Sequence, residues 1–314
     1  EARRAVVLTL VTSVASSYVT LRDLDKQLEI SKQTAKTRED SYKLFQLRFT
    51  GGVISELQLS QVKSEYEAAL ATIPRIEKSI GQQENLISIL LGRNPRAIPR
   101  GKTIDELVPP SVPAGLPSDL LERRPDIRQA EQNLISANAN IGVAKALYFP
   151  TISLTGFLGT SSASLSDLFS GPSKIWSYAV PISLPIFTAG AIEGQVRAAE
   201  AIQRQALFQY EKAIQNGFRE VDDALIDQNK TREQLQAQLR QIDALKVYAR
   251  LARVRYEEGY TSYVEVLDAE RSLFDRELSY AQTQDLLFQA LVNLYKAMGG
   301  GWVVEAENKV AKGE

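Results

Sequence analysis

The sequence predicts a mainly α-helical protein in which a long antiparallel helical hairpin occurs twice, together with one β-hairpin suited to a membrane. Three observations support this fold class. Long stretches almost free of Gly and Pro carry apolar residues every three or four positions. The segments at 48–55 and 255–262 resemble each other, which indicates a duplication. Residues 148–187 include two stretches that alternate between apolar and small or polar side chains.

Composition narrows the function classes. The 314 residues include 37 Lys and Arg, 38 Asp and Glu, and neither Cys nor His. A formal charge of −1 excludes a strong basic field, so we expect no nucleic-acid partner. Within this chain the missing Cys and His exclude thiol nucleophiles, Ser-His-Asp triads and zinc sites with those ligands. No catalytic motif or Gly-rich phosphate loop is visible, so we expect no enzyme, cofactor or metal.

Residues 1–93 are predicted to form the first helical hairpin. Helical spacing is present from the start, with apolar residues at Val6, Leu10 and Val14. Neither an initiator Met nor a signal peptide precedes it, which we interpret as a truncated N-terminus. A signal peptide or a lipid-anchored Cys is therefore expected upstream. No uninterrupted apolar run reaches the ~18–20 residues of a transmembrane helix.

The second hairpin is predicted at 189–299, followed by a tail at 300–314. An offset of 207 residues aligns the two copies, placing Gly52 on Gly259 without any insertion. Glycine tolerates the positive φ of a sharp turn, so each copy is expected to reverse direction there. Between the copies, residues 94–117 hold six of the twelve prolines, which predicts a connector. A shorter helix is expected at 118–147.

The segment 148–188 is predicted to be a transmembrane β-hairpin with an external loop. Each strand is ~10 residues long, the length that crosses a bilayer at a tilt. A soluble hairpin with one wet face is the alternative. The side chains expected to face lipid are Ile152, Leu154, Leu158, Trp176, Tyr178, Val180, Ile182, Leu184 and Ile186.

The repeat offset places a matching strand pair of the first copy before residue 1. Two strands cannot close a barrel, and open strand edges are not tolerated in lipid. Several protomers are therefore expected to share one barrel.

The sequence contains several distinctive motifs: Leu-Glu-Arg-Arg-Pro-Asp-Ile at 121–127, the run at 144–156, Pro-Ile-Phe at 185–187, Arg-Tyr-x-x-Gly at 255–259, and the runs at 266–274 and 293–302. Together they resemble the TolC-like outer membrane factors, and most closely the outer membrane lipoproteins of multidrug tripartite efflux systems. The resemblance covers essentially the whole chain. The sequence departs from the family where Thr188 replaces the common acidic residue after Pro-Ile-Phe, and in lacking the lipid-anchor region and first strand pair.

The resemblance implies a homotrimer with an outer-membrane β-barrel and a long periplasmic helical tunnel. It also implies a periplasmic adaptor and an inner-membrane pump of the resistance-nodulation-division type as partners. The expected function is an exit duct that conducts passively what the pump expels. No catalysis is needed for that role.

Charged residues near the second turn suggest a gate. Arg255, Glu265 and Asp268 are expected to gather there, and in a trimer each would occur three times around an axis. A ring of carboxylates in a narrow opening attracts cations, and an arginine can bridge neighbours. By resemblance Asp268, with Arg255 and Val264, is placed at the periplasmic gate. A solvated helix face is the alternative for Glu265 and Asp268.

The turns themselves are expected to contact the adaptor, again by resemblance. The residues concerned are Gly52, Val53, Ser55, Gly259, Thr261 and Ser262. Simple turn chemistry explains the same residues equally well. A soluble or periplasmic coiled-coil scaffold or adaptor is the alternative for the whole protein, although the duplication and the amphipathic strand pair argue against it.

Overall fold

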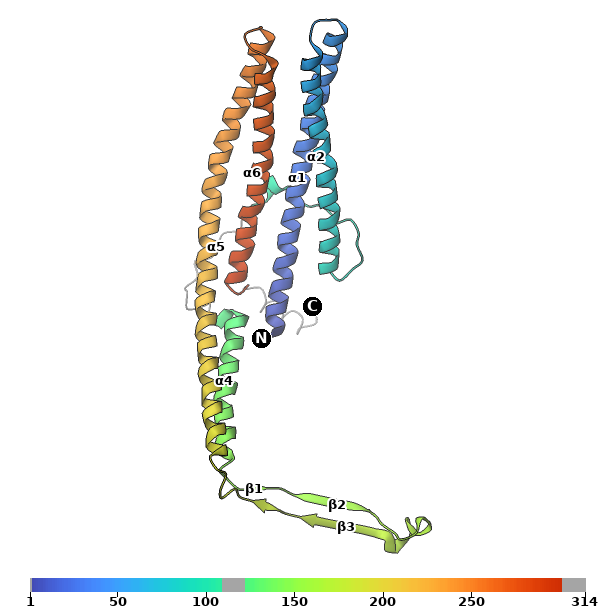
Figure 1. Cartoon of the computed structure of the whole chain (residues 1–314), viewed down its shortest axis with the longest axis vertical. Coiled ribbons are helices and arrows are strands. Elements are labelled where there is room, and N and C mark those ends of the chain that lie inside the picture. The colour runs from blue at the N-terminus through green and yellow to red at the C-terminus, as the bar shows by residue number, and fades with distance from the viewer. Residues whose placement is uncertain (1, 109–121, 301–314) are drawn as a thin grey trace. The chain divides into compact units, whose positions relative to one another are not determined.

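The computed structural model describes residues 2–108 and 122–300, which divide into two compact units. The larger unit comprises residues up to 125 and from 216 onward, and the smaller unit spans 126–215. The main helices are α1 (Ala2–Thr50), α2 (Glu56–Leu90), α4 (Pro125–Ala146), α5 (Ala191–Glu257) and α6 (Tyr263–Ala297) (Figure 1). The predicted mainly helical fold class is confirmed.

In the larger unit, the helix ends follow the offset found in the sequence. Both α2 and α6 contain 35 residues, and they begin at positions 56 and 263, which are 207 apart. The same offset relates the last residues of α1 and α5, Thr50 and Glu257. At the far ends, Gly92 and Gly299 follow α2 and α6 with φ of 67° and 83°. The two hairpins therefore share their turns and their helix lengths.

Helix α1 packs along both α2 and α6, so it joins the two hairpins within the larger unit. Where α1, α2, α5 and α6 meet near the turns, a core forms from Phe45, Val62, Ala252, Tyr263, Val266, Leu267 and Ala269. A second core, nearer the start of α1, consists of Leu21, Ile87 and Ile98. The apolar stripes read from the sequence are thus helix-packing surfaces.

Helix α1 also passes a length-and-composition test for crossing a membrane. An 18-residue window within it reaches a mean hydropathy of 1.4. Thr and Ser residues interrupt the apolar ones there, so the window is not the uninterrupted apolar run considered in the sequence. A single such helix near the N-terminus is weak evidence, because packed core helices pass the same test.

The described part of the connector, residues 94–108, crosses α1 and α2 as a strap. The Arg100 guanidinium bridges Asp25 (2.9 Å) and Glu84, and the Gly101 N–H donates to the Tyr18 hydroxyl (2.8 Å). The 3₁₀ helix η1 (Ile104–Glu106) buries Ile104 to 1% exposure. The remainder of the predicted connector, 109–117, lies outside the described residues.

Helix α4 begins at Pro125, whereas the sequence predicted one helix from residue 118. Residues 118–121 of that prediction lie outside the described residues, and residues 122–123 are helical. Proline suits the first helical position, where its missing N–H costs nothing. The β-hairpin consists of β1 (Thr151–Ile152), β2 (Thr155–Thr160), β3 (Lys174–Ala179) and β4 (Ile182–Ser183), with β1 paired to β4 and β2 to β3. The short 3₁₀ helices η2 (Leu165–Asp167) and η3 (Gly171–Ser173) lie between β2 and β3.

Each expected ten-residue strand is therefore interrupted. The break falls beside Pro181, which has no N–H to donate to a ladder, although its carbonyl still accepts from the Ser153 N–H (3.2 Å). The pairs Thr151–Ser183 and Thr155–Ala179 lie in the same register, so the hairpin remains in phase across the break.

Candidate functional site

The two hairpin turns have nearly the same backbone geometry. Gly52 and Gly259 have φ of 70° and 80°, and a Cβ added at either would meet no atom within 4 Å. The backbone conformation, rather than space, therefore favours glycine there. The N–H of Val53 donates to the Arg48 carbonyl (2.9 Å), and the equivalent Tyr260 N–H donates to the Arg255 carbonyl (2.8 Å).

The turns differ in their side-chain caps. Ser55 forms a reciprocal capping box with Gln58, whereas the Ser262 side chain makes no cap hydrogen bond. Instead the Thr261 hydroxyl donates to the Glu265 carboxylate within the second turn. Both turns expose an apolar side chain at the equivalent position, Val53 at 74% and Tyr260 at 75% exposure. The turns therefore combine local capping with an exposed apolar tip.

The predicted gate residues do not form one cluster in a single chain. Val264 and Asp268 line a small cleft of about 250 Å³ between α6 and α2, together with Gln61 and Arg271. Gln61 occupies the position in the first repeat that Asp268 occupies in the second. Glu265 is held by Thr261 outside this cleft, and Arg255 is exposed. Among residues 2–108 and 122–300, neither Arg255 nor Asp268 has an ion-pair partner.

Beside this cleft, a buried arginine joins α1 to α2, and the carboxylate that it binds also reaches the second hairpin, which the sequence did not predict. The Arg38 guanidinium lies 3.1 Å from the Glu65 carboxylate and also donates to the Glu65 carbonyl (2.8 Å). Glu65 in turn pairs with Arg271 of α6. The Arg38 guanidinium lies 5.4 Å from the centre of the Phe274 ring. We call Arg38, Glu65 and Arg271 the inter-hairpin ion cluster.

Aromatic side chains hold the two hairpins together close to the turns. Arg48 donates to the Tyr256 hydroxyl (3.1 Å) and lies over the Phe45 ring. The Phe45 and Tyr263 ring centres are 4.3 Å apart, and Tyr256 meets Tyr263 edge-on at 4.9 Å. Burial raises the pKa of the Tyr263 phenol above its ordinary value. These contacts link α1 with both helices of the second hairpin.

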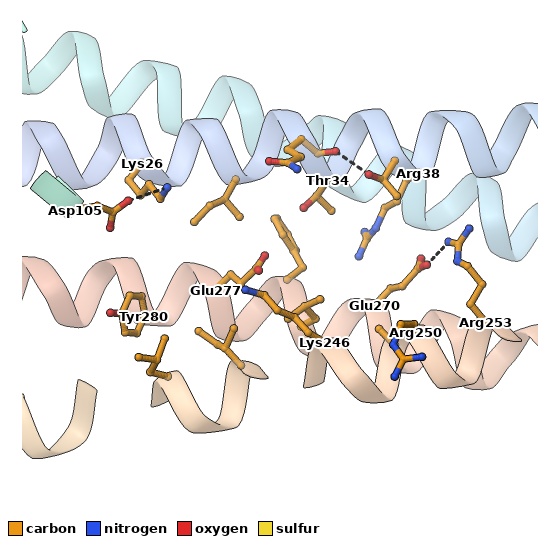
Figure 2. A pocket seen from close by; sticks show the side chains of 18 residues that line it. Lys26, Thr34, Arg38, Asp105, Lys246, Arg250, Arg253, Glu270, Glu277 and Tyr280 are labelled. Carbon is orange, nitrogen blue, oxygen red and sulfur yellow. Dashed lines mark hydrogen bonds and ion pairs between the residues drawn. The ribbon is translucent and has the colours of Figure 1, made fainter. Parts of the chain in front are cut away.

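A larger pocket of about 690 Å³ lies between α1, η1, α5 and α6 (Figure 2). Its charged side chains come from all four elements, and Arg253 pairs with Glu270 across α5 and α6. Although burial disfavours the charged guanidinium, that hydrogen bond raises the pKa of Arg253. Burial raises the pKa of Glu277, against the opposing charges of Lys246 and Lys26.

No metal site accompanies these charges. Within the described ranges, no group of three or more acidic, His or Cys side chains is arranged to hold a metal ion. The mixture of cations and carboxylates in the pocket of Figure 2 is instead typical of helix–helix ion pairing.

The β-hairpin register places five of the predicted lipid-facing side chains on one face of their ladders, namely Ile152, Leu158, Trp176, Tyr178 and Ile182. Leu158 pairs with Trp176, and Ile152 pairs with Ile182, so each pair shares a face of its ladder. The Trp176 and Tyr178 rings stack at 6.1 Å. All nine predicted residues are exposed, from Leu184 at 51% to Ile186 at 93%. The hairpin therefore presents a large uncovered apolar surface, which in soluble proteins marks an interaction site.

Comparison with known proteins identifies the family. The family model described as "Outer membrane efflux protein" matches residues 1–93 and 116–300. The chain is 39% identical over 309 residues to the cation efflux system protein CusC of Escherichia coli O6:H1. It is also 39% identical over 308 residues to the probable outer membrane lipoprotein SilC of Salmonella typhimurium. These alignments cover 96% of this chain and 66% of the length of each relative.

Solved structures agree with this assignment. A crystal structure of CusC has a TM-score of 0.85 at 38% identity, covering 96% of this chain and 70% of that one. The open state of the Neisseria gonorrhoeae MtrE outer membrane channel has a TM-score of 0.82 at 34% identity, covering 95% and 68%. The fold and the internal repeat of this chain, together with these similarities, show that it belongs to the outer membrane efflux protein family.

Proposed function

We propose that the protein is the outer membrane exit channel of a tripartite efflux pump. The observation that carries this proposal is the uncovered apolar face of the β-hairpin in a chain that also holds two long helical hairpins. Lipid would cover that face, and the helices would extend into the periplasm. Family membership supports this location. A coiled-coil scaffold or adaptor gives no reason for the exposed apolar residues along one face of the strand ladders.

One strand pair leaves open edges that lipid does not tolerate, so several protomers are proposed to share one barrel. The resemblance to the family sets their proposed number at three. The proposed partners are outer membrane lipid, a periplasmic adaptor and an inner-membrane pump. Transport energy would come from the pump, so this chain would provide only a conduit. Relatives of this chain are named for the efflux of cations, toluene and antibiotics, which fits a conduit that does not select among these chemical classes.

We propose that Asp268 carries the periplasmic gate. Its carboxylate is exposed and without an ion pair among the described residues, so it is available to face its copies across a trimer axis. Three carboxylates in a narrow opening would repel one another and attract cations. Val264 beside it would narrow the same opening, and Arg255 and Glu265 would act from the turn. An adaptor is proposed to contact the exposed tips at Val53 and Tyr260 and the turn residues around them.

Single-channel recording in planar bilayers, on the product of the complete gene, tests both proposals. The variants are Asp268→Ala and, as the matched control, Gln61→Ala at the equivalent position of the first repeat. We expect a small conductance from the wild type and from Gln61→Ala, and a larger one from Asp268→Ala. Both substitutions alter partly exposed positions, where effects on stability are usually small.

Three outcomes separate the proposals. A conducting Asp268→Ala variant that matches the wild type would keep the channel and remove Asp268 from the gate. An equal increase from Gln61→Ala would assign the effect to the cleft rather than to the charge. Folded, membrane-inserted protein without conductance would overturn the channel proposal and favour the alternative hypothesis of a coiled-coil scaffold.

A further inference from the structure

The contact between α1 and α6 contains two acidic residues that no described cation neutralises. Asp23 of α1 is 4% exposed, and its charge interacts with that of Asp285 of α6. Neither carboxylate has an ion-pair partner among residues 2–108 and 122–300. A buried, uncompensated pair of like charges is costly, so the site favours taking up a proton.

The hydrogen bonds at this contact leave one oxygen without a partner. Gln27 donates to Asp23 Oδ2 (2.7 Å), whereas the buried Asp23 Oδ1 has no hydrogen-bond partner. On the other side, Asp285 accepts from the Thr20 hydroxyl (3.3 Å) and from Gln289 Nε2 (3.1 Å). Protonation of Asp23 would remove the like-charge repulsion without breaking any of these bonds.

The charged groups on the neighbouring elements are already paired with others. On α1 itself, Arg22 pairs with Asp25, and Lys26 pairs with Glu29 and with Asp105 of η1. On α2, Glu84 is bound by Arg100. Among the groups packed against α1 here, Asp285 is the charge that acts on Asp23, and it raises the proton affinity of Asp23.

The repeated fold does not require this acid pair. The 207-residue offset places Lys230 at the position of Asp23 and Lys78 at the position of Asp285. The same helix positions therefore carry lysines in the other copy. The acid pair is a feature of this one junction between the first and second hairpins.

We propose that the Asp23–Asp285 pair is a proton-operated clasp between the two helical hairpins. With Asp23 protonated, α1 and α6 pack without charge repulsion. With both carboxylates ionised, the junction loosens. Burial, followed by the Asp285 charge, raises the pKa of Asp23 to about 7, and burial also raises the pKa of Asp285. The clasp would thus respond within the pH range of the surroundings of a bacterium.

The sign of the pH effect follows from linkage. Asp23 binds its proton more tightly when folded, with a pKa near 7 against 3.8 in the unfolded chain. The protonated Asp23 therefore contributes its full stabilisation below pH ~4. This contribution falls between pH ~4 and pH ~7 and stays at its lowest value above pH ~7. Relative to a variant that cannot ionise, the folding equilibrium of the wild type should weaken about tenfold per pH unit across that window.

The test compares the wild type with Asp23→Asn in the full-length protein, by thermal unfolding between pH 4 and 8.5. Asparagine resembles the protonated acid, so we expect equal stability near pH 4, an advantage of the variant that grows as the pH rises to about 7, and a constant advantage above. Hydrogen–deuterium exchange of residues 16–27 and 281–291 localises the change. Asp275→Asn, at an exposed acid of α6, is the matched control and should follow the wild type.

Asp285→Asn provides a second variant that retains Asp23. Without the Asp285 charge, Asp23 should ionise at a lower pH, so the fall in stability with rising pH should end at a lower pH than in the wild type. Parallel pH profiles for wild type, Asp23→Asn and Asp285→Asn would overturn the clasp. Protection of the wild type by calcium chloride at pH 8, absent in Asp23→Asn, would also overturn it, because the pair would then hold a cation instead of a proton.

Discussion

Glu65 of the inter-hairpin ion cluster provides the sharpest test of how the larger unit is held together, because it pairs with Arg38 inside the first hairpin and with Arg271 of the second. Glu65→Gln removes the charge that faces Arg38, whose side chain is only 7% exposed. The guanidinium would remain buried against Phe274 without a counter-charge. Removing one partner of a buried ion pair costs about 3–5 kcal/mol. We expect a loss of that size from one substitution of nearly equal volume.

The loss can be measured as a change in melting temperature. At ~2.1 cal/mol/K per residue, unfolding of 314 residues has an entropy of roughly 0.7 kcal/mol/K. The expected decrease is therefore about 5–8 °C, followed by circular dichroism at 222 nm on the detergent-solubilised protein. If unfolding is not two-state, the decrease is compared between variants and not converted to a free energy.

Two controls separate the buried charge from the exposed one. Arg271 is 55% exposed, so Arg271→Gln should cost at most about 1 kcal/mol, or roughly 1–2 °C. Adding Arg38→Met to Glu65→Gln removes the unpaired charge and should recover part of the loss. A decrease below 2 °C for Glu65→Gln, or an equal decrease for Arg271→Gln, would refute the reasoning.

Two further predictions concern the turns and the strands. Gly52→Ala and Gly259→Ala should each cost about 1–2 kcal/mol of stability, because each glycine has a positive φ. No neighbour lies close enough for the added methyl to clash, so thermal melts should give similar losses for both. Unequal losses would mean that the turns differ in more than their caps. Leu158→Arg should destabilise the protein in lipid by about 2–4 kcal/mol, whereas Ser177→Arg, on the opposite face of the ladder, should cost much less, as measured by refolding into vesicles. Equal losses would contradict a lipid-covered face.

Much of the fold could be predicted because its signals are local. Helical spacing, the glycines at 52 and 259, and the 207-residue offset together anticipated helix ends that the structure places at equivalent positions. Pro181 interrupts the ladder, which the alternation of apolar and polar residues alone does not predict. The described residues show a break in the predicted helix at Arg124, before α4 begins at Pro125, and apolar spacing alone does not locate such a break.

The candidate gate was only partly predictable. Asp268 and Val264 do share a cleft, since they are four residues apart on one helix. Arg255 belongs to α5 and was expected to join them, yet it remains exposed and does not line that cleft. Proximity in sequence to a turn does not decide which way a side chain points from a helix.

By itself the sequence determined the helical hairpins, their duplication and the apolar face of the strand pair, because periods of 3.6 and 2 residues are properties of the local chain. Only the tertiary structure decided which charges meet. Arg271 of α6 is drawn to the Glu65 carboxylate that Arg38 already binds, and the charge of Asp285 acts on Asp23. The members of the pairs Arg271–Glu65 and Asp23–Asp285 are more than 200 residues apart in the chain. Such pairings depend on the rotation and stagger of one long helix against another, which no local pattern encodes.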